Sequence, residues 1–370
     1  MAGSTYGTIF KITTWGESHG RGIGVVIDGC PAGLSLSEED IQVYLDRRKP
    51  GQNKYTTKRA EGDRVEILSG TFEGKTTGTP ISLIVFNEDQ RSRDYGNLAT
   101  CYRPGHADYT FQSKYGIRDY RGGGRSSGRE TIGRVAAGAI ASKFLKELGI
   151  EILAYTKSIG PISIPEERYS YSEIDQNPLY MPNNDYAKQA SSYLDSCMKN
   201  LDSSGGIVEC VIKNMPVGIG EPVFEKLDAN LAKAILSIGA VKGFEIGDGF
   251  SVSSSTGSTN NDPFRSLGGK ITKQTNHSGG VLGGMSDGSN LVFRAAFKPT
   301  PSIAQSQETV NMFGKNTELV IHGRHDPIIV PRAVVVVESM AALTIADMLL
   351  LNMAARLDRI TEFYKRDELL

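Results

Sequence analysis

The stretch RDYRGGGRSSGRETIGRVAAGAIASKFLKEL, residues 118–148, joins a basic glycine-rich turn directly to an apolar helical pattern. The three glycines at 122–124 let backbone N–H groups approach a ligand closely, and a following helix N-terminus adds partial positive charge. The turn and the first helical residues carry five arginines, whose guanidinium groups can bind anions through paired hydrogen bonds: Arg118, Arg121, Arg125, Arg129 and Arg134. The stretch predicts either an exposed basic turn capping an ordinary helix or an anion site at a helix entrance.

The helical part of this stretch is apolar on one face and unusually rich in small residues. Its apolar positions follow i, i+3, i+4 spacing from Ile132 to Leu148, and Gly149 ends the pattern. Glycine and alanine at 133, 136–139 and 141 indicate close contact with a neighbouring element. We therefore expect a buried central helix.

The remaining pattern alternates short strands with a few long helices. Strands are predicted at 8–14, 24–28, 65–68, 81–86, 206–212, 291–297 and 318–322. Helices are predicted after the Ser37 capping box, at 185–200, from an Asp228 cap, and at 333–357. Residues 156–204 are predicted to form a polar surface excursion, and 251–276 a mobile Ser/Thr/Asn loop. Neither a fixed-period repeat nor a Rossmann βαβ register is visible in the sequence, and this organisation favours an α+β fold.

Bulk composition excludes several classes of protein. The 370 residues contain 41 Lys+Arg and 42 Asp+Glu, which argues against general attraction to nucleic acid or membranes. The four cysteines are scattered, as expected for reduced thiols in the cytosol. No secretory signal is visible, and the longest apolar run, 333–351, is interrupted by Glu338 and Asp347. The composition predicts a soluble, cytoplasmic protein.

A basic segment at 47–59 contains six Lys or Arg residues and no acid. A solvated loop is the ordinary interpretation of such a run, and a mobile lid over a polyanion is the alternative. Non-catalytic binding of anions or RNA by segments 47–59 and 118–134 is therefore a competing function. The absence of regular aromatic interleaving between the arginines counts against it.

The motifs that contain histidine could indicate a hydrolase, a metal site or a proton-transfer site, and the sequence favours the last. Gly16–Gly20 matches the G-x-S-x-G nucleophile elbow, but strand-like residues follow instead of the helix that the elbow requires, so we reject a hydrolase. His322 and His325 lack a third ligand at a zinc-like spacing, so no metal site is expected. His19, His106 and His325 each lie in turns with glycine or arginine, which favours proton transfer near a bound anion.

From the residues alone, the sequence indicates an enzyme for a small, multiply anionic ligand, together with a phosphate-bearing cofactor. The glycine clusters at 122–124, 239–249 and 279–284 offer backbone contacts for that larger ligand. A pyridine-nucleotide oxidoreductase is disfavoured because no G-x-G-x-x-G lies between a strand and a helix.

Six motifs taken together resemble the chorismate synthase family and follow its order along the chain. They are GESHG (16–20), RPGHAD (103–108), GRSSGRET (124–131), AVKGFEIG (240–247), FKPTPS (297–302) and GRHDP (323–327). The resemblance implies a single domain over 1–370, with central helices packed between antiparallel sheets and mobile loops near 47–59 and 251–276. It implies a lyase of the shikimate pathway that converts 5-enolpyruvylshikimate-3-phosphate to chorismate by anti-1,4-elimination of phosphate. It also implies reduced FMN without net redox change, and a homotetramer.

The resemblance also implies roles for individual residues. The catalytic residues would be His19, protonating the departing phosphate, His106, at flavin N1, and Asp326, near flavin N5. Flavin contacts would come from Arg125, Ser126, Ser127, Gly239, Ala240, Gly283, Lys298, Pro299, Thr300, Pro301, Ser302 and Arg324. Substrate would be bound by Arg48, Arg129 and Arg134, while Arg48 and Lys54 match positions associated with NADP.

Two features of the resemblance bear on the cofactors. No reductase segment is recognisable, so we expect flavin reduced externally, with NADPH as the candidate internal reductant. Gly128, Gly239 and Ser278 depart from the family, which usually has Ala, Asn and Ala there. We expect the change at Gly239 to weaken flavin binding modestly without altering the reaction.

Overall fold

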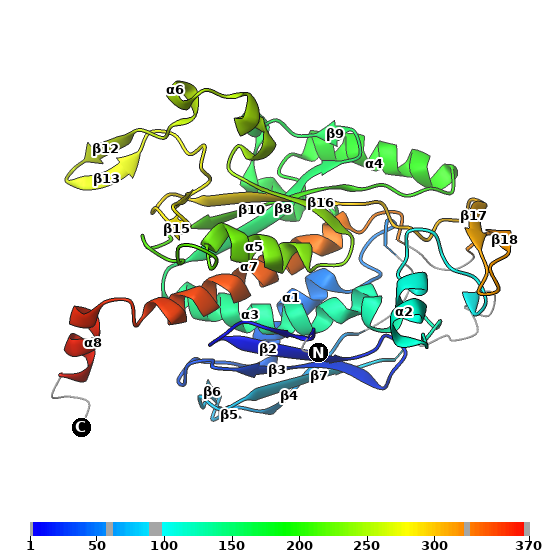
Figure 1. Ribbon diagram of the computed structural model, residues 1–370, viewed down its shortest axis with the longest axis horizontal. Helices are drawn as coiled ribbons and strands as arrows, with labels where there is room; N and C mark the ends of the chain where they lie inside the picture. The colour runs from blue at the N-terminus through cyan, green and yellow to red at the C-terminus, as the bar shows by residue number, and fades with distance from the viewer. Residues whose placement is uncertain (1–2, 57–61, 89–97, 322–325, 366–370) are drawn as a thin grey trace.

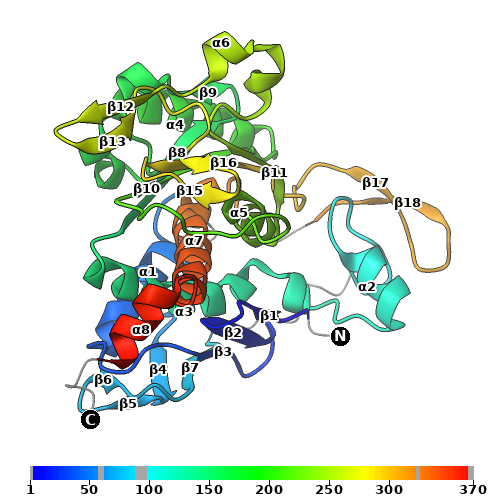
Figure 2. The same cartoon turned by 60° about the vertical axis from the view of Figure 1, so that its left-hand side comes forward.

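The computed structural model describes residues 3–56, 62–88, 98–321 and 326–365. It consists of two five-stranded sheets with helices between them (Figures 1 and 2). Every strand pair in both sheets is antiparallel. This arrangement confirms the α+β prediction, and one hydrophobic core cluster includes residues of both sheets and of the helices between them.

The first sheet has the strand order β1-β2-β3-β7-β4. Its strands are β1 (Thr5–Tyr6), β2 (Lys11–Gly16), β3 (Gly22–Asp28), β7 (Ile81–Phe86) and β4 (Val65–Ser69). In β7, Ile81, Leu83 and Val85 alternate with less buried residues, the pattern of a strand with one face on the core. That face packs against α3, and the sequence predicted four of the five strands.

The second sheet has the order β11-β16-β10-β8-β9. Its strands are β11 (Val241–Ile246), β16 (Leu291–Phe297), β10 (Gly206–Lys213), β8 (Glu151–Ile159) and β9 (Ile162–Ser163). The predicted strand 291–297 has the same first and last residues as β16. The prediction that residues 156–204 are only a surface excursion is wrong at its start, because β8 continues to Ile159 with Thr156 and Ile159 fully buried.

Four helices fill the space between the sheets, namely α1 (Glu38–Arg48), α3 (Thr131–Glu147), α5 (Leu227–Leu236) and α7 (Val330–Asn352). The Ser37 capping box forms with Asp40, as the sequence predicted. The small residues of α3 also have the predicted role, since a Cβ at Gly138 would lie 2.2 Å from the Ser339 Cβ of α7. Helix α3 is therefore the buried central helix that the sequence indicated.

Helix α7 is long and apolar enough to cross a membrane by length and composition alone. However, 83% of its most apolar window is buried inside the protein. It is the core helix between the two sheets (Figure 1).

The other elements surround this sandwich. They are the helices α2 (Asp108–Tyr115), α4 (Asn184–Lys199), α6 (Gly257–Asn260) and α8 (Leu357–Tyr364), with the two-stranded pairs β5 (Thr71–Phe72) with β6 (Lys75–Thr76), β12 (Phe264–Leu267) with β13 (Lys270–Lys273), β14 (Val281–Leu282) with β15 (Met285–Ser286), and β17 (Gln307–Val310) with β18 (Asn316–Leu319). The four cysteines are unpaired, and three of them are buried.

Three sequence predictions need correction at element ends. The predicted helix 333–357 stops at Asn352, and α8 begins separately at Leu357. Helix α5 has Lys226 at its N-cap, so Asp228 lies in the first turn instead of capping it. Segment 251–276 was predicted as a mobile loop, but it contains α6 and the β12–β13 hairpin.

Asp347 of α7 anchors the N-terminal segment to the core. Its carboxylate accepts hydrogen bonds from the backbone N–H groups of Thr8, Ile9 and Phe10 at 2.9, 2.7 and 2.9 Å. We expect Asp347→Ala to lower the free energy of unfolding by about 3 kcal/mol, because three backbone donors, of which that of Phe10 is buried, lose a charged acceptor. Urea unfolding tests this, with the exposed Asp358→Ala as control. Equal stability of the two variants would contradict the anchoring role.

Candidate active site

Two histidines from distant parts of the chain pack against adjacent glycines of the turn at 122–124. A Cβ on Gly122 would lie 2.3 Å from His19 Cε1, and one on Gly123 would lie 3.0 Å from His106 Cε1. The three glycines have φ of 70°, 88° and 53°, a region that other residues rarely adopt. The glycine turn thus brings together His19 and His106, two of the three predicted catalytic residues.

His19 lies in the turn that connects β2 to β3. Its Nδ1 is 3.1 Å from the Ser18 hydroxyl. Strand β3 follows this turn, so the rejection of a hydrolase elbow is confirmed. Asn87 holds the turn in place by donating to the carbonyls of Glu17 and Gly20 at 3.1 and 2.8 Å.

His106 is held by a buried ion pair in the RPGHAD motif. The Arg103 guanidinium donates to both oxygens of Asp108 at 2.8 and 2.7 Å. His106 Nδ1 lies 3.2 Å from Asp108 Oδ1. Burial acts to raise the pKa of Asp108, but hydrogen bonds from Arg103 and His106 outweigh it and hold that pKa well below its ordinary value.

The lowered pKa of Asp108 makes the free energy of unfolding depend on pH. A carboxyl whose pKa is depressed by folding stabilises the protein above its unfolded value of about 3.9, and this contribution is lost as pH falls through the folded pKa. We expect Asp108→Asn to destabilise by roughly 3 kcal/mol at pH 7, because Arg103 stays buried without its counter-ion. The difference from wild type should be constant between pH 6 and 8 and shrink below about pH 4. A difference in urea unfolding free energy that is independent of pH would contradict this.

Lys298 connects three of the motifs. Its side chain donates to the Gly105 carbonyl, and its backbone N–H donates to the Ala240 carbonyl at 3.0 Å. A Cβ on Gly105 would lie 3.1 Å from the Pro301 Cβ. Segments 103–108, 239–240 and 298–302 therefore converge beside His106.

Two predicted arginines meet in a buried cluster at the helix entrance. Arg48 Nη2 and Arg129 Nη1 each lie 3.1 Å from a different oxygen of Asp63. Arg129 Nε also donates to Asn87 Oδ1 at 3.0 Å, so Asn87 joins this cluster to the turn of His19. Burial, partly offset by Asp63, lowers the pKa of Arg48 to about 10, which leaves the group charged at neutral pH.

Asp326, the third predicted catalytic residue, adjoins the same cluster. Its carboxylate accepts from Arg332 at 2.5 Å, and Arg332 Nε donates to the Arg48 carbonyl at 2.9 Å. Arg324 and the histidines at 322 and 325 lie outside the described residues. Within the part of the chain that the structure describes, no group of three His, Cys, Asp or Glu side chains could hold a metal ion.

The other predicted residues are placed as follows. Arg125 bonds to the Gly16 and Thr14 carbonyls and so fixes the glycine turn to β2. Ser126 bonds within the turn and Ser127 caps the 3-10 turn at 128–130. Arg134 bonds to Glu130 and to Ser237, two residues before Gly239. Pro299, Thr300 and Ser302 belong to the segment of Lys298 and Pro301, and the Thr300 carbonyl accepts from Ser203.

Two predicted residues are not brought to this cluster. Lys54 is exposed and paired with Asp195 at 2.8 Å. Gly283 lies in the β14–β15 hairpin, next to the start of α5, since Gly284 accepts from the Leu227 N–H. Gly239 and Ala240 follow the opposite end of that helix.

The sequence did not predict three residues of the site, namely Asp63, Asn87 and Arg332. Each is important through partners far away in sequence, such as the Asp63–Arg129 and Asn87–Arg129 contacts. The only local signal was Arg332 at the start of the apolar pattern of α7, beside Pro331.

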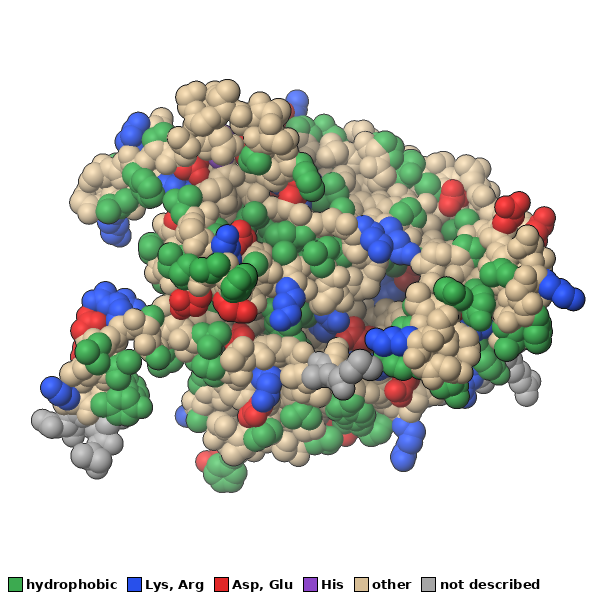
Figure 3. Space-filling model, viewed as in Figure 1, with side chains coloured by type: hydrophobic (Ala, Val, Ile, Leu, Met, Phe, Trp, Pro, Cys, Tyr) green, Lys and Arg blue, Asp and Glu red, His purple; other side chains and the backbone are tan. Residues whose placement is uncertain are grey.

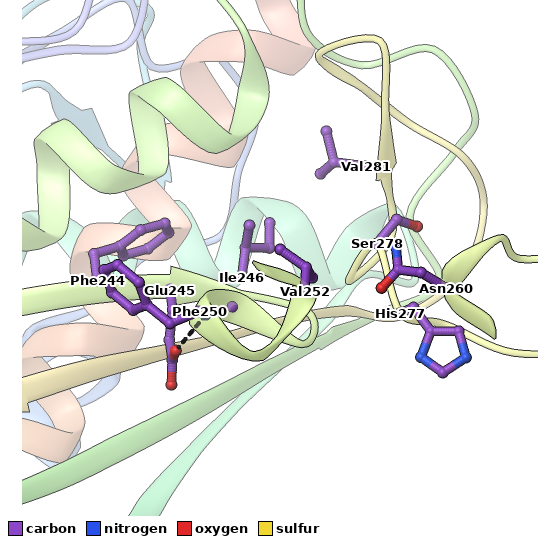
Figure 4. A pocket seen from close by; sticks show the side chains of 10 residues that line it. Phe244, Glu245, Ile246, Phe250, Val252, Asn260, His277, Ser278 and Val281 are labelled. Atoms are coloured by element: carbon purple, nitrogen blue, oxygen red, sulfur yellow. Dashed lines mark hydrogen bonds between the residues drawn. The ribbon is translucent and has the colours of Figure 1, made fainter. Parts of the chain in front are cut away.

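Figure 4 shows a separate pocket along β11. Phe244, Ile246, Phe250 and Val252 form its apolar part, and His277 lies 2.6 Å from Asp248 at its other side. None of the predicted site residues lines it. The departure Ser278, also at this pocket, bonds to Asp262 and to buried Lys273, both at 2.7 Å, whereas a Cβ at Gly128 or Gly239 would meet nothing within 4 Å.

The arrangement argues against the RNA-binding alternative. Arg48, Arg118 and Arg129 are nearly fully buried and paired with carboxylates, so they form no exposed basic surface. Nonspecific nucleic-acid binding needs accessible cations along a groove.

Comparison with known proteins places the chain among enzymes. The chorismate synthase family model matches residues 10–350. The chain is 69% identical to the chorismate synthase of Agathobacter rectalis over 99% of its length and all of that protein. It is 65% identical to that of Lachnoclostridium phytofermentans, with the same coverage. A crystal structure of a chorismate synthase superposes with a TM-score of 0.76 at 31% identity, covering 97% of each chain. The chain therefore belongs to the chorismate synthase family, the shikimate-pathway lyases that form chorismate by eliminating phosphate from 5-enolpyruvylshikimate-3-phosphate.

Proposed function

We propose that the turn at 122–124 lies between the binding sites of the substrate and of reduced FMN. In this proposal His19 acts on the substrate and His106 acts on the flavin. The observation that carries this proposal is the packing of the two imidazoles against Gly122 and Gly123, beside the buried arginine pair. Because the adjacent glycines carry no side chains, the two ligands can lie close together on either side of this turn. Figure 3 shows Lys and Arg side chains gathered around a hollow beside α2 on this face.

The residues present fit a flavin phosphate and ring system. Thr300 Oγ1 is buried and has no hydrogen-bond partner among the described residues, so a polar ligand atom can satisfy it. Lys298 and Ser302 add polar groups. When bound, reduced FMN supplies an electron to the substrate transiently and regains it, so the reaction has no net redox change.

Substrate binding is assigned to the arginines. The substrate carries one phosphate and two carboxylates, and Arg48 and Arg129 supply charge-assisted hydrogen bonds to such groups. We assign Arg134 to the edge of this site, and its bonds to Glu130 and Ser237 support the assignment. Burial of the arginine pair strengthens its attraction for a bound anion, because water screens it little.

The proton transfers follow from the same geometry. His19 donates a proton to the departing phosphate, which leaves poorly without charge neutralisation. His106, held by Asp108, would keep a proton at the N1 side of a bound flavin, and Asp326, held by Arg332, would act near its N5 side. Bound reduced flavin would supply the base for the ring proton lost from the substrate, and the products would be chorismate and inorganic phosphate.

An anaerobic assay tests this assignment. Enzyme, reduced FMN and 5-enolpyruvylshikimate-3-phosphate should release phosphate and chorismate in equal amounts, and oxidised FMN should support no turnover. Absence of product in folded protein with reduced flavin would contradict the proposal.

We infer that the flavin is reduced before it binds, with NADPH as the competing reductant. The candidate NADP residue Lys54 is exposed and paired with Asp195, whereas Arg48 is buried in the anion cluster. NADPH added with oxidised FMN should therefore be consumed no faster than without enzyme. Enzyme-dependent NADPH oxidation would overturn this inference.

We further propose a cytoplasmic homotetramer. The β12–β13 hairpin and α8 project from the same side of the molecule, on the left in Figures 1 and 3, and expose apolar side chains. Leu267, Ile271, Leu357 and Tyr364 are each more than 70% exposed, and neither a lone hairpin nor an eight-residue helix is stable by itself. Contact with further copies of the chain covers such surfaces. Light scattering should give four times the chain mass of 40.1 kDa, and a monomer would contradict the proposal.

A further inference from the structure

Asp63 occupies an unusual position between the two arginines assigned to the substrate. One carboxylate oxygen lies 3.1 Å from Arg48 Nη2, and the other lies 3.1 Å from Arg129 Nη1. The Asp63 side chain is completely buried, and those of Arg48 and Arg129 are 1% and 6% exposed. A single carboxylate thus holds two guanidinium groups side by side.

The backbone of Asp63 is strained. Its φ is 45°, a region that residues other than glycine seldom adopt. Strain of this kind persists where the surrounding structure enforces it, and it concentrates at functional sites. The neighbouring pair Arg47–Glu338 shows that an arginine of the same helix end is neutralised without such strain. Neutralisation alone therefore does not explain Asp63.

The cluster retains unused capacity for an anion. Arg48 Nε is buried and has no hydrogen-bond partner among the described residues. Two guanidinium groups here lie against one shared carboxylate, and the pair Arg332–Asp326 lies beside them. Without Asp63, the two buried cations would repel each other and separate.

We propose that Asp63 is a positioning residue that aligns Arg48 and Arg129 so that both address the same anionic group of the substrate. Asp63 itself touches neither substrate nor flavin. This inference rests on the proposed function, which assigns the two arginines to the substrate.

The test compares Asp63→Asn and Asp63→Gly with Asp185→Asn, an exposed aspartate of α4 that is paired with Lys188. Asp63→Gly relieves the positive φ, so it protects the measurement against a failure to fold. Both Asp63 variants should raise KM for the substrate roughly 10- to 100-fold, because misplaced binding groups lose orientation. The turnover number should change much less.

Three further readouts separate positioning from a structural role. The inhibition constant of inorganic phosphate should rise with KM, the dissociation constant of reduced FMN should stay unchanged, and added formate should partly restore KM in Asp63→Gly. Unchanged KM in folded Asp63 variants would overturn the proposal. Tighter phosphate binding would overturn it too, because Asp63 would then be a competitor of the substrate. Failure of the proposed function is distinguishable, since wild type and Asp185→Asn would themselves give no turnover.

Discussion

His106→Ala is expected to slow turnover by roughly 10²- to 10⁴-fold, the usual contribution of a positioned acid–base group. His106 packs against Gly123 and lies 3.2 Å from Asp108, which is itself fixed by Arg103. The alanine removes the ring that we propose acts on the flavin, while leaving the Arg103–Asp108 pair intact. Steady-state turnover under anaerobic conditions with reduced FMN measures the effect.

His277→Ala is the matched control for this prediction. His277 is half-buried in the separate pocket along β11 and is also paired with an aspartate, Asp248. Its loss should leave turnover near the wild-type value. Near wild-type turnover of His106→Ala would refute the role of His106, whereas equal losses in both variants would point to a general structural effect.

Gly138→Val is expected to produce the largest loss of stability. A Cβ at this position would lie 2.2 Å from Ser339 Cβ and 2.5 Å from Ser339 Cα. The second contact is with backbone, so rotation of a side chain cannot relieve it, and α3 and α7 must separate. We expect the free energy of unfolding to fall by at least about 3 kcal/mol, at the upper end for overpacked cores.

Gly128→Ala is the control for the glycine substitution, because a Cβ there meets nothing within 4 Å. Urea unfolding followed by circular dichroism should give near wild-type stability for Gly128→Ala and a much lower midpoint for Gly138→Val. Similar midpoints for wild type and Gly138→Val would show that the two helices do not pack as closely as the structure has them.

Much of the fold could be predicted because its elements have strong local signals. The capping box at Ser37, the small-residue face of α3 and the alternation in 81–86 all define their elements without reference to the rest of the chain. Sheet order was not predictable, since β11 pairs with β16 and β16 with β10 across long connections. The hairpin β12–β13 was missed because its residues are exposed and lack apolar alternation.

The candidate site likewise contains residues that the sequence could predict and residues that it could not. Glycine and arginine motifs pointed to His19, His106, Arg48 and Arg129, because their chemistry is visible in short stretches. Asp63 and Asn87 were invisible, since an isolated aspartate or asparagine in a polar segment carries no signal until folding places it beside Arg129. Family resemblance supplied roles, but it could not supply these long-range contacts.

The absorbance spectrum of reduced FMN tests most directly whether both ligands bind against the turn at Gly122–Gly124. Anaerobic enzyme is mixed with reduced FMN, first alone and then with 5-enolpyruvylshikimate-3-phosphate. We expect a spectral change that appears only when enzyme, flavin and substrate are all present, because the two ligands then meet at this turn. A spectrum that is unaffected by substrate, in folded enzyme shown to bind both ligands, would contradict it.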